Sequence, residues 1–344
     1  MTPITSTHIS DNAPFAGPDR VLLIAEIGSN HDGKFDQALR LMDVAAKAGA
    51  DAVKFQSFLA DHLVRKDSPD HAVLKKIELP REWYPRLKQA AAERGMIFFS
   101  TATNDITLGW LQECGAEMYK IASPNLTHLP LIRKTAAIGK PVVMSTGMAG
   151  MQQIDEAVQA FLSSGNRQLY LLHCVSEYPA RPGLINLRFI NTLRALYPFP
   201  IGFSDHTLDI GTAIAAVALG ARVIEKHLTA DRSSPGPDHH YALQPDEFIA
   251  MARNIRDVEA ALGSAHKVLS PAELEKSALA WRSLHAATDL PEGTVLAPEH
   301  ISVIRPNDGL HSRLFDDIVG MRLRMPLRTG QAITWESFKD GLAD

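Results

Sequence analysis

The sequence lacks the features of several classes of protein. It has only two cysteines among 344 residues, Cys114 and Cys174, which argues against a disulfide framework and favours a cytoplasmic location. No apolar run approaches the roughly 18 residues of a membrane helix, and the first twenty residues lack the apolar core of a signal peptide. Acidic and basic residues are mixed and the formal net charge is −4, so no basic stripe indicates nucleic acid. We therefore expect a globular protein that needs neither a membrane nor a nucleic acid.

What the sequence does contain is a series of short apolar runs, each ending in a polar or charged residue. Eight such runs occur, at residues 21–28, 50–56, 95–101, 118–123, 141–146, 168–174, 200–205 and 222–227. Strands of a (β/α)8 barrel are buried on both faces and therefore read as continuous apolar runs. The pattern predicts an α/β fold of the TIM-barrel type, which builds its active site at the carboxyl ends of the strands.

The segments between the runs carry apolar residues at helical spacing and stop near glycine, as helix C-termini often do. Helices are expected over residues 35–48, 105–114, 155–162, 208–219 and 246–262. Either Asn104 or Asp105 could be the N-cap of the second of these helices. Two longer loops, residues 58–78 and 229–243, should lie at the catalytic face and could act as lids.

The rhythm of runs and helices breaks after Gly263. Residues 264–280 read as a linker with one helical turn, and short pieces at 283–287, 301–304 and 322–326 follow, separated by turns. A mostly β module of this size would bury little core alone. The expected organisation is a flexible leader (1–20), a barrel (21–264), a linker (265–280) and a small β domain (281–344).

The residues that end the runs form an inventory of candidate catalytic groups at the barrel mouth. They are Glu26, Lys54, Gln56, Ser100, Thr101, Lys120, Ser123, Ser145, Thr146, His173, Ser204, Asp205, His206, Glu225, Lys226 and His227. His206 and His227 end neighbouring runs, so their imidazoles could converge on one divalent metal, or each could be a hydrogen-bonded barrel histidine. Two nitrogens leave room for water or substrate, which suits exchangeable Mn²⁺, Mg²⁺, Fe²⁺ or Co²⁺ more than a closed zinc site. Asp205 or Glu225 could orient an imidazole.

Lysines and small polar side chains dominate the rest of this inventory. Lys54 and Lys120, and Lys226 if it faces the same cavity, would supply positive charge, while the hydroxyl and amide groups would bind further oxygens. This combination favours a site for a phosphorylated anion over lysines that are merely solvated. Glu26 could bind a sugar hydroxyl or move a proton, or it could form a structural ion pair with a lysine. Asp238, in a turn of the last barrel loop, could present a second carboxylate.

Several motifs occur together along the chain. They are AEIGSNHDG at 25–33, KFQ at 54–56, YKIAS at 119–123, STGM at 145–148, LHC at 172–174, FSDHT at 203–207, EKH at 225–227 and PGPD at 235–238. RSL at 282–284, a turn at Gly293, HI at 300–301 and IRP at 304–306 accompany them in the tail. In combination these motifs resemble the sialic acid synthase family with its C-terminal antifreeze-like (SAF) module, over about residues 20 to 340.

The resemblance implies a metal-dependent condensation of phosphoenolpyruvate with an N-acylated mannosamine-like aldose, giving a nine-carbon 2-keto sugar acid and phosphate. It implies phosphoenolpyruvate contacts at Lys54, Gln56, Thr101, Lys120, Ser123 and Ser204, metal ligands at His206 and His227, and sugar contacts at Glu26, Tyr178 and Asp238. Glu26, Lys54, Lys120 and His206 are the expected catalytic residues, and Mn²⁺ the expected metal, with Mg²⁺ or Co²⁺ as alternatives. Arg305 matches an arginine that reaches the sugar from a partner subunit, which implies a domain-swapped homodimer.

Departures from the family pattern fall on the sugar side. Pro124 and Asn125 stand where the family has a sugar-binding acid, Ala102 and Thr103 replace a Pro-Phe pair, and Ser176 replaces Asn or Thr. The aldose could therefore be N-acetylmannosamine, its 6-phosphate, or a diamino sugar of the legionaminic or pseudaminic routes.

Two other functions compete with this interpretation. One is a phosphoenolpyruvate–aldose synthase that makes an eight- or seven-carbon keto acid, but such barrels need no SAF tail. The other is a non-enzymatic glycan- or ice-binding module. Ice binding favours a weakly charged surface, and the tail is rich in arginine, at positions 305, 313, 322, 324 and 328.

Overall fold

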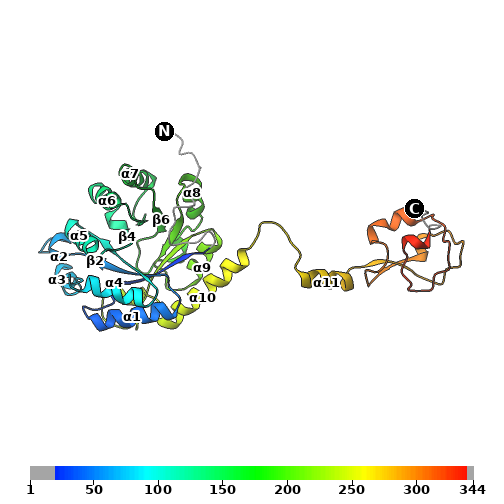
Figure 1. The fold of residues 1–344 in the computed structure, drawn as a ribbon, viewed down its shortest axis with the longest axis horizontal. Helices are drawn as coiled ribbons and strands as arrows, with labels where there is room; N and C mark the ends of the chain where they lie inside the picture. Colours follow the sequence, from blue (N-terminus) through cyan, green and yellow to red (C-terminus); the bar gives the residue numbers. More distant parts are fainter. Residues whose placement is uncertain (1–19, 339–344) are drawn as a thin grey trace. The chain divides into compact units, whose positions relative to one another are not determined.

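The computed structural model describes residues 20–338, and the chain forms two compact units that divide between Gly263 and Ser264 (Figure 1). The leader expected over residues 1–20 lies, apart from Arg20, outside the described residues. None of the helices in the described range 20–338 is long and apolar enough to cross a membrane.

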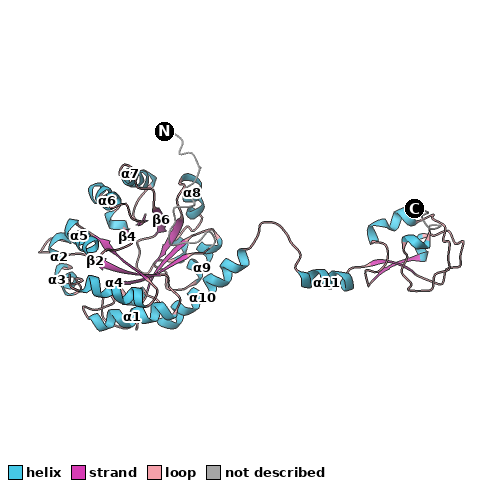
Figure 2. Ribbon diagram, viewed as in Figure 1, coloured by secondary structure: helices cyan, strands magenta, loops and turns pink. Residues whose placement is uncertain are grey.

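The first unit is a closed barrel of parallel strands, as the apolar runs predict (Figure 2). The strands are β1 (Leu22–Gly28), β2 (Ala52–Ser57), β3 (Ile97–Ala102), β4 (Tyr119–Ile121), β5 (Val142–Ser145), β6 (Leu169–Cys174), β7 (Ile201–Asp205) and β8 (Val223–His227). They pair in chain order, and β8 closes the barrel against β1 with His227 in register with Glu26. All eight strand ends therefore meet around one mouth.

Side chains alternate between the inside and the outside of this barrel, because successive residues of a strand point to opposite faces. The interior is filled by an apolar layer that includes Leu22, Phe99, Val143 and Val223. The residues between them, such as Ile224, belong instead to the larger core between strands and helices. This parity decides which polar residues reach the mouth.

Helices cover the outside of the barrel. They are α1 (Phe35–Lys47), α4 (Trp83–Glu93), α5 (Asp105–Glu113), α6 (Leu129–Ala137), α7 (Met151–Leu162), α8 (Phe189–Leu196), α9 (Gly211–Ala218) and α10 (Pro245–Leu262). The side chain of Asn104 accepts a hydrogen bond from Thr107 N at 2.9 Å, which identifies Asn104 as the N-cap of α5. The helix expected from residue 208 begins only at Gly211, because Asp209 accepts from Gly211 N and holds a turn there.

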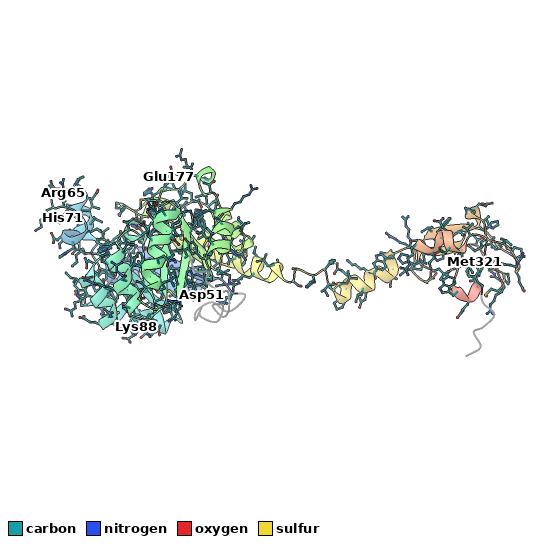
Figure 3. All side chains as sticks on the ribbon, turned by 90° about the horizontal axis from the view of Figure 1, so that it is seen from above. Asp51, Arg65, His71, Lys88, Glu177 and Met321 are labelled. Carbon is teal, nitrogen blue, oxygen red and sulfur yellow. The ribbon has the colours of Figure 1, made fainter. Side chains whose placement is uncertain are left out.

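Short helices fill the loops at the mouth. The loop after β2 contains α2 (Ala60–Leu63) and α3 (His71–Lys76), which Asp61 links by accepting from His71 at 3.1 Å and Lys75 at 3.2 Å. Figure 3 labels Arg65 and His71 on this segment. Single 3₁₀ turns follow β4, β6 and β8; they are η2 (Ser123–Asn125), η3 (Pro182–Leu184) and η4 (His239–Tyr241).

The second unit contains helix α11 (Pro271–Ala280) and a small β module. The linker was expected to hold one helical turn, but α11 is ten residues long because Ser270 and Glu273 form a capping box before a run of good helix formers. In the module, β9 (Ser283–Ala286) and β10 (Ile301–Ile304) pair antiparallel around a core of Leu284, Leu296 and Ile333. Shorter helices complete it; they are η5 (Pro298–His300), η6 (Ser312–Leu314), α12 (Phe315–Ile318) and η7 (Trp335–Ser337).

Candidate active site

The strand ends surround a small polar pocket of about 60 Å³, which we call the inner pocket. Lys54, Lys120, Ser145, Ser204 and Glu225 all line it. They come from β2, β4, β5, β7 and β8 and share the inward parity of their strands. The inner pocket therefore gathers both lysines that the sequence predicts for an anion.

Two buried carboxylates neutralise these lysines. Lys120 Nζ lies 3.0 Å from Glu225 Oε2, and Lys54 Nζ lies 3.5 Å from Glu225 Oε1. Lys54 also forms an ion pair with Glu26, so the structural role considered for Glu26 is present. Ser204 Oγ donates to Glu225 Oε1 at 3.1 Å. Glu225, which was not among the expected catalytic or binding residues, is the common partner of both lysines.

The protonation of this network follows from burial and pairing. Burial alone would raise the pKa of Glu225, but Lys120 and Lys54 lower it to about 2. Burial raises the pKa of Glu26 to about 7, although Lys54 opposes the shift. Burial alone would lower the pKa of Lys54, yet Glu225 and Glu26 outweigh it and raise the value. Burial lowers the pKa of Lys120, against the attraction of Glu225. Lys54 and Glu225 are thus firmly charged, while Glu26 can exchange a proton near neutral pH.

The other expected phosphoenolpyruvate contacts surround the same mouth. Ser123 Oγ accepts from Gly147 N at 2.9 Å, and Gln56 Nε2 donates to Glu26 Oε1 at 3.1 Å. Thr101 is in register with Lys120, and its buried hydroxyl has no hydrogen-bond partner among residues 20–338. These groups retain hydrogen-bonding capacity that a bound anion could use.

A second pocket of about 270 Å³, which we call the outer pocket, adjoins the inner one. Gln56, Tyr178 and His227 line both pockets, and Asp238 and Tyr241 line only the outer one. Asp238 and Tyr241 come from the loop after β8, so this loop contributes to the site.

Asp238 is the second carboxylate of the mouth. Its Oδ2 accepts from Ser29 N at 3.5 Å and lies 3.8 Å from His227 Nδ1. Burial alone would raise its pKa, but His227 and hydrogen bonds from Tyr241 and Ser29 hold the pKa of Asp238 below its ordinary value. A Cβ at Gly28, whose φ is +52°, would lie 2.9 Å from Asp238 Oδ2 and 2.8 Å from Glu26 Oε1. Gly28 therefore keeps open the space between the two carboxylates.

The two histidines lie together at the boundary between the pockets, with ring centroids 5.5 Å apart. His206 Nδ1 donates to Val175 O at 2.8 Å, which leaves the lone pair on Nε2. His227 Nδ1 is buried without a hydrogen-bond partner in the described part of the chain. Burial lowers the pKa of His227 to about 3, so its ring is neutral, as a metal ligand requires.

These residues fit a divalent metal that is held partly by water or substrate. An orphaned buried ring nitrogen and a second histidine with a free lone pair provide two ligands. No group of three His, Cys, Asp or Glu suited to a metal occurs within residues 20–338. The expectation that Asp205 or Glu225 orients an imidazole is wrong, since the carbonyl of Val175 orients His206 and the carboxylates pair with lysines.

Several residues of the sequence inventory point away from the mouth, among them Lys226, Asp205, Ser100 and His173. Lys226 lies between the inward-facing Glu225 and His227, so it points outward, where it donates to Asp205 Oδ2 at 2.8 Å and to Thr207 O at 2.5 Å. Ser100 bonds to Ser57 at 2.7 Å. His173 bonds to the carbonyl of Ile185 at 2.6 Å. Lys226 is therefore not part of the cationic ring.

Arg305 belongs to the second unit, where it follows β10 and is exposed. Its peptide bond to Pro306 is cis. Ser283 Oγ donates to Pro306 O at 2.7 Å and accepts from Gly309 N at 2.9 Å. Two hydrogen bonds from β9 therefore support the loop that presents Arg305.

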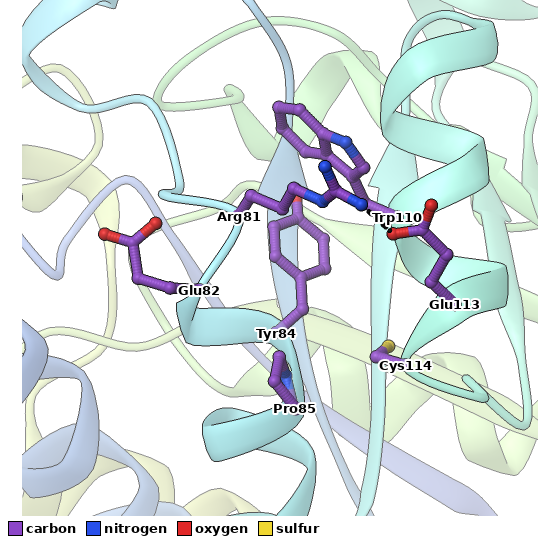
Figure 4. A pocket seen from close by; sticks show the side chains of 7 residues that line it. All are labelled: Arg81, Glu82, Tyr84, Pro85, Trp110, Glu113 and Cys114. Atoms are coloured by element: carbon purple, nitrogen blue, oxygen red, sulfur yellow. Dashed lines mark hydrogen bonds and ion pairs between the residues drawn. The ribbon is translucent and has the colours of Figure 1, made fainter.

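Another cavity, of about 380 Å³, lies between the start of α4 and the end of α5 (Figure 4). Tyr84 and Trp110 meet edge to face there, with ring centroids 5.8 Å apart, and Arg81 pairs with Glu113 at 2.7 Å. None of the expected site residues lines this cavity. The catalytic candidates are instead concentrated at the strand ends.

Fold and site together define a TIM-barrel enzyme with a buried pocket, lined by two lysines, at its mouth. The chain belongs to the NeuB family, whose model matches residues 41–267, and an SAF domain matches residues 282–339. It is accordingly a synthase of the type that condenses phosphoenolpyruvate with sugars, and the family resemblance noted in the sequence is confirmed.

Relatives in several bacteria resemble three quarters or more of the chain. The spore coat polysaccharide biosynthesis protein SpsE of Bacillus subtilis is 37% identical over 346 residues, covering 92% of this chain and 93% of that protein. The N,N'-diacetyllegionaminic acid synthase of Legionella pneumophila is 37% identical over 332 residues, covering 91% and 93%. The crystal structure of N-acetylneuraminic acid synthetase from Leptospira borgpetersenii, in complex with citrate, superposes with a TM-score of 0.72 at 34% identity, covering 76% of this chain and 92% of that one.

Proposed function

We propose that this enzyme condenses phosphoenolpyruvate with an N-acylated mannosamine-like aldose, giving a nine-carbon sialic-acid-type 2-keto acid and phosphate. The observation that carries this proposal is the pair of adjoining pockets at one barrel mouth, an inner one with two lysines and an outer one with a carboxylate. Relatives named for neuraminic and legionaminic acid synthesis support it.

The inner pocket would bind phosphoenolpyruvate. Lys54 and Lys120 can make charge-assisted bonds to its phosphate or carboxylate. Gln56, Thr101, Ser123 and Ser204 are proposed to bind the remaining oxygens. Glu225, which pairs with both lysines, and Glu26, which pairs with Lys54, would offset the lysine charges in the empty pocket, since an unpaired buried charge is costly.

The outer pocket would bind the sugar through Glu26, Tyr178 and Asp238. We propose that Arg305 of one subunit completes the sugar site of its neighbour in a domain-swapped homodimer. Its place on a loop that Ser283 supports in the second unit is consistent with a presented contact.

His206 and His227 would hold a divalent metal, Mn²⁺ in the first instance and Mg²⁺ or Co²⁺ as alternatives. When bound, such an ion supplies Lewis-acid polarisation of the aldehyde of the open-chain sugar. In the reaction, C3 of phosphoenolpyruvate attacks the aldehyde carbon, water adds to C2, and the tetrahedral adduct expels phosphate. Glu26, whose pKa burial raises to about 7, is proposed to move the proton, with a water on the metal as the alternative. A cytoplasmic location completes the proposal.

The decisive assay measures phosphate released from phosphoenolpyruvate across a panel of N-acetylmannosamine, its 6-phosphate and diamino sugars. Phosphate release that depends on one of these sugars supports the proposal. Release with none of them, or only with aldoses that lead to eight- or seven-carbon acids, would overturn it.

An isotope experiment tests which bond of phosphoenolpyruvate is cleaved, the C–O bond or the P–O bond. Because water is proposed to attack C2, the C–O bond breaks and the bridging oxygen leaves with phosphate. Phosphoenolpyruvate labelled with ¹⁸O at that bridge should deliver the label to inorganic phosphate. Label retained in the keto acid would mean P–O cleavage and a different mechanism.

Subunit mixing tests the domain swap. Arg305→Ala and His206→Ala proteins should each be inactive, but a mixture with confirmed subunit exchange should recover partial activity. A chain shortened to about residue 270 should lose sugar affinity. An exchanged mixture that stays inactive would show that the SAF domain does not complete a neighbour's site.

A further inference from the structure

Of the four residues from Asp238 to Tyr241, two line the outer pocket, and a third, His239, is buried away from it. Asp238 and Tyr241 line the pocket, and the Tyr241 ring packs against His227 with centroids 4.9 Å apart. His239, between them, does not line it and is only 1% exposed. Its ring is therefore used inside the protein and does not touch the substrate space.

Both nitrogens of the His239 ring have partners. Nε2 lies 2.9 Å from Asp32 Oδ1, and Nδ1 lies 2.7 Å from Thr229 Oγ1. A carboxylate can only accept, so Nε2 donates to Asp32. Asp32 belongs to the loop after β1, and Thr229 begins the loop after β8. His239 thus joins two loops that are far apart in the sequence.

The loop after β8 forms one wall of the outer pocket, and the loop after β1 supports that wall from behind. Ser29, in the loop after β1, donates its N–H to Asp238 Oδ2. The loop after β8 is closed at its base by a bridge between Leu228 and Leu243. His239 is a second anchor within that loop, directly next to Asp238.

The fit around the His239 ring is close. A Cβ at Gly236 would lie 2.7 Å from His239 Cδ2, a distance that no real side chain adopts. Gly236 therefore lets the loop wrap the ring. Asp32 has a φ of +53°, a conformation that Asn also tolerates well, so an amide can replace its carboxylate without new strain.

We propose that His239 is a positioning residue for the aminosugar: by clamping Asp32 and Thr229 together, it holds the Asp238 carboxylate at the sugar side of the mouth. This inference rests on the proposed function. Small displacements of a substrate-binding group are costly in rate, because a bound substrate must be held in near-attack geometry. The inner pocket lies on strand ends that His239 does not touch, so loss of the His239 hydrogen bonds should leave the binding of phosphoenolpyruvate unchanged.

The test compares variants that differ in one hydrogen bond. His239→Leu removes both ring contacts, whereas in His239→Gln the amide can still donate to Asp32. Asp32→Asn keeps an acceptor for His239 without the charge. His173→Leu is the matched control, because it removes a buried histidine hydrogen bond from the outer side of the same barrel.

With phosphate release as the assay, His239→Leu should lower kcat/KM for the aminosugar on the order of 10- to 100-fold. The KM for phosphoenolpyruvate should stay within about twofold by the same reasoning. The single variants His239→Gln and Asp32→Asn should each keep most of the wild-type kcat/KM for the aminosugar. His173→Leu should lower Tm without this split between substrates.

A double-mutant cycle separates positioning from general stability. If His239 acts through Asp238, His239→Leu should add little further loss in an Asp238→Asn background. Additive losses, or equal losses for both substrates, would overturn the inference. Wild-type enzyme that releases no phosphate with any aminosugar would instead contradict the proposed function, and the inference with it.

Discussion

The inner and outer pockets are built in different ways. The inner pocket is made mainly by residues within or at the ends of strands, such as Lys54, Lys120 and Glu225, which are at most 4% exposed. The outer pocket takes Tyr178, Asp238 and Tyr241 from loops, and Tyr178 is 46% exposed. Within the barrel unit, the inner pocket thus belongs to the strand framework, and we call it the framework half of the site. The outer pocket is carried by loops attached to that framework, and we call it the attached half.

This difference indicates how one family could serve several sugars. A network of buried charges on strands tolerates little change, because removing one partner leaves another charge unpaired. Loop residues can be exchanged with less effect on the fold. Of the departures from the family pattern, Thr103, Pro124, Asn125 and Ser176 lie outside the strands, and Ala102 is the last residue of β3. We therefore expect variants of the two pockets to separate the two substrates.

The largest effect should come from the boundary that the pockets share. His206→Ala and His227→Ala should each reduce turnover to background, because the proposed metal would stabilise the charge of the transition state by several kcal/mol. Both variants should stay folded. Chelation should also abolish turnover, and Mn²⁺ should restore it. Full activity after exhaustive chelation would show that the reaction needs no metal, and that no metal connects the two pockets.

Glu26→Gln should come next, with a fall in kcat of about 100-fold, at the lower end for general acid–base groups. The pH profile of kcat/KM should lose an ionisation near pH 7, because burial raises the pKa of Glu26 to about 7. A carboxyl whose pKa is raised by folding stabilises the protein fully below its ordinary pKa, and this contribution disappears as pH rises through 7.

The free energy of unfolding reports the same ionisation independently of catalysis. Relative to the Gln variant, which cannot ionise, wild type should lose stability between about pH 5 and pH 8. Denaturant titrations at several pH values provide the measurement. A difference that does not change with pH would show that Glu26 is charged throughout this range and only pairs with Lys54.

Lys120→Met tests the inner pocket alone. A charge-assisted bond contributes about 1.5–3 kcal/mol, so the KM for phosphoenolpyruvate should rise roughly 10- to 150-fold and the KM for the sugar should change little. Lys120→Met should also lower stability, because Glu225 loses one of its two lysine partners. Adding Glu225→Gln should restore stability, because it removes that carboxylate charge. Lys226→Met, a buried lysine of the outer face, should lower stability but not phosphoenolpyruvate affinity. Equal changes in both KM values would contradict the division into two pockets.

The framework half of the site was largely predictable from sequence. Strand ends can be recognised as apolar runs that stop at polar residues, and both lysines and both histidines of the mouth were found in this way. The error at Lys226 has a simple cause. Glu225 and His227 cannot both face inward unless Lys226 faces outward, and this alternation also explains Ser100 and His173. Applied to the sequence, the same rule would have selected Glu225 as a partner of the lysines.

The attached half was less predictable. Tyr241 reaches the outer pocket from η4 in the loop after β8, and no periodic pattern encodes the path of that loop. Asp238 was predicted from a turn in the last barrel loop and again from the family motif, and not from the alternation of residues along a strand. Helix α11 was underestimated for another reason, since the capping signal at Ser270 and Glu273 was present but was not used.

The smallest effect should come from Tyr178→Phe. The Tyr178 ring packs on His206 with centroids 4.4 Å apart and on Tyr241 at 5.1 Å, and phenylalanine keeps both contacts. Only the hydroxyl is lost, and a neutral hydrogen bond contributes about 0.5–1.5 kcal/mol net. The KM for the sugar should therefore rise about 2- to 13-fold, while the KM for phosphoenolpyruvate stays unchanged. Tyr178→Ala, which also removes the ring from His206, should lower kcat as well. If Tyr178→Phe instead raises the KM for phosphoenolpyruvate, the Tyr178 hydroxyl contributes to the inner pocket, which Tyr178 also lines. Tyr178 would then belong to the phosphoenolpyruvate site and not to the sugar site.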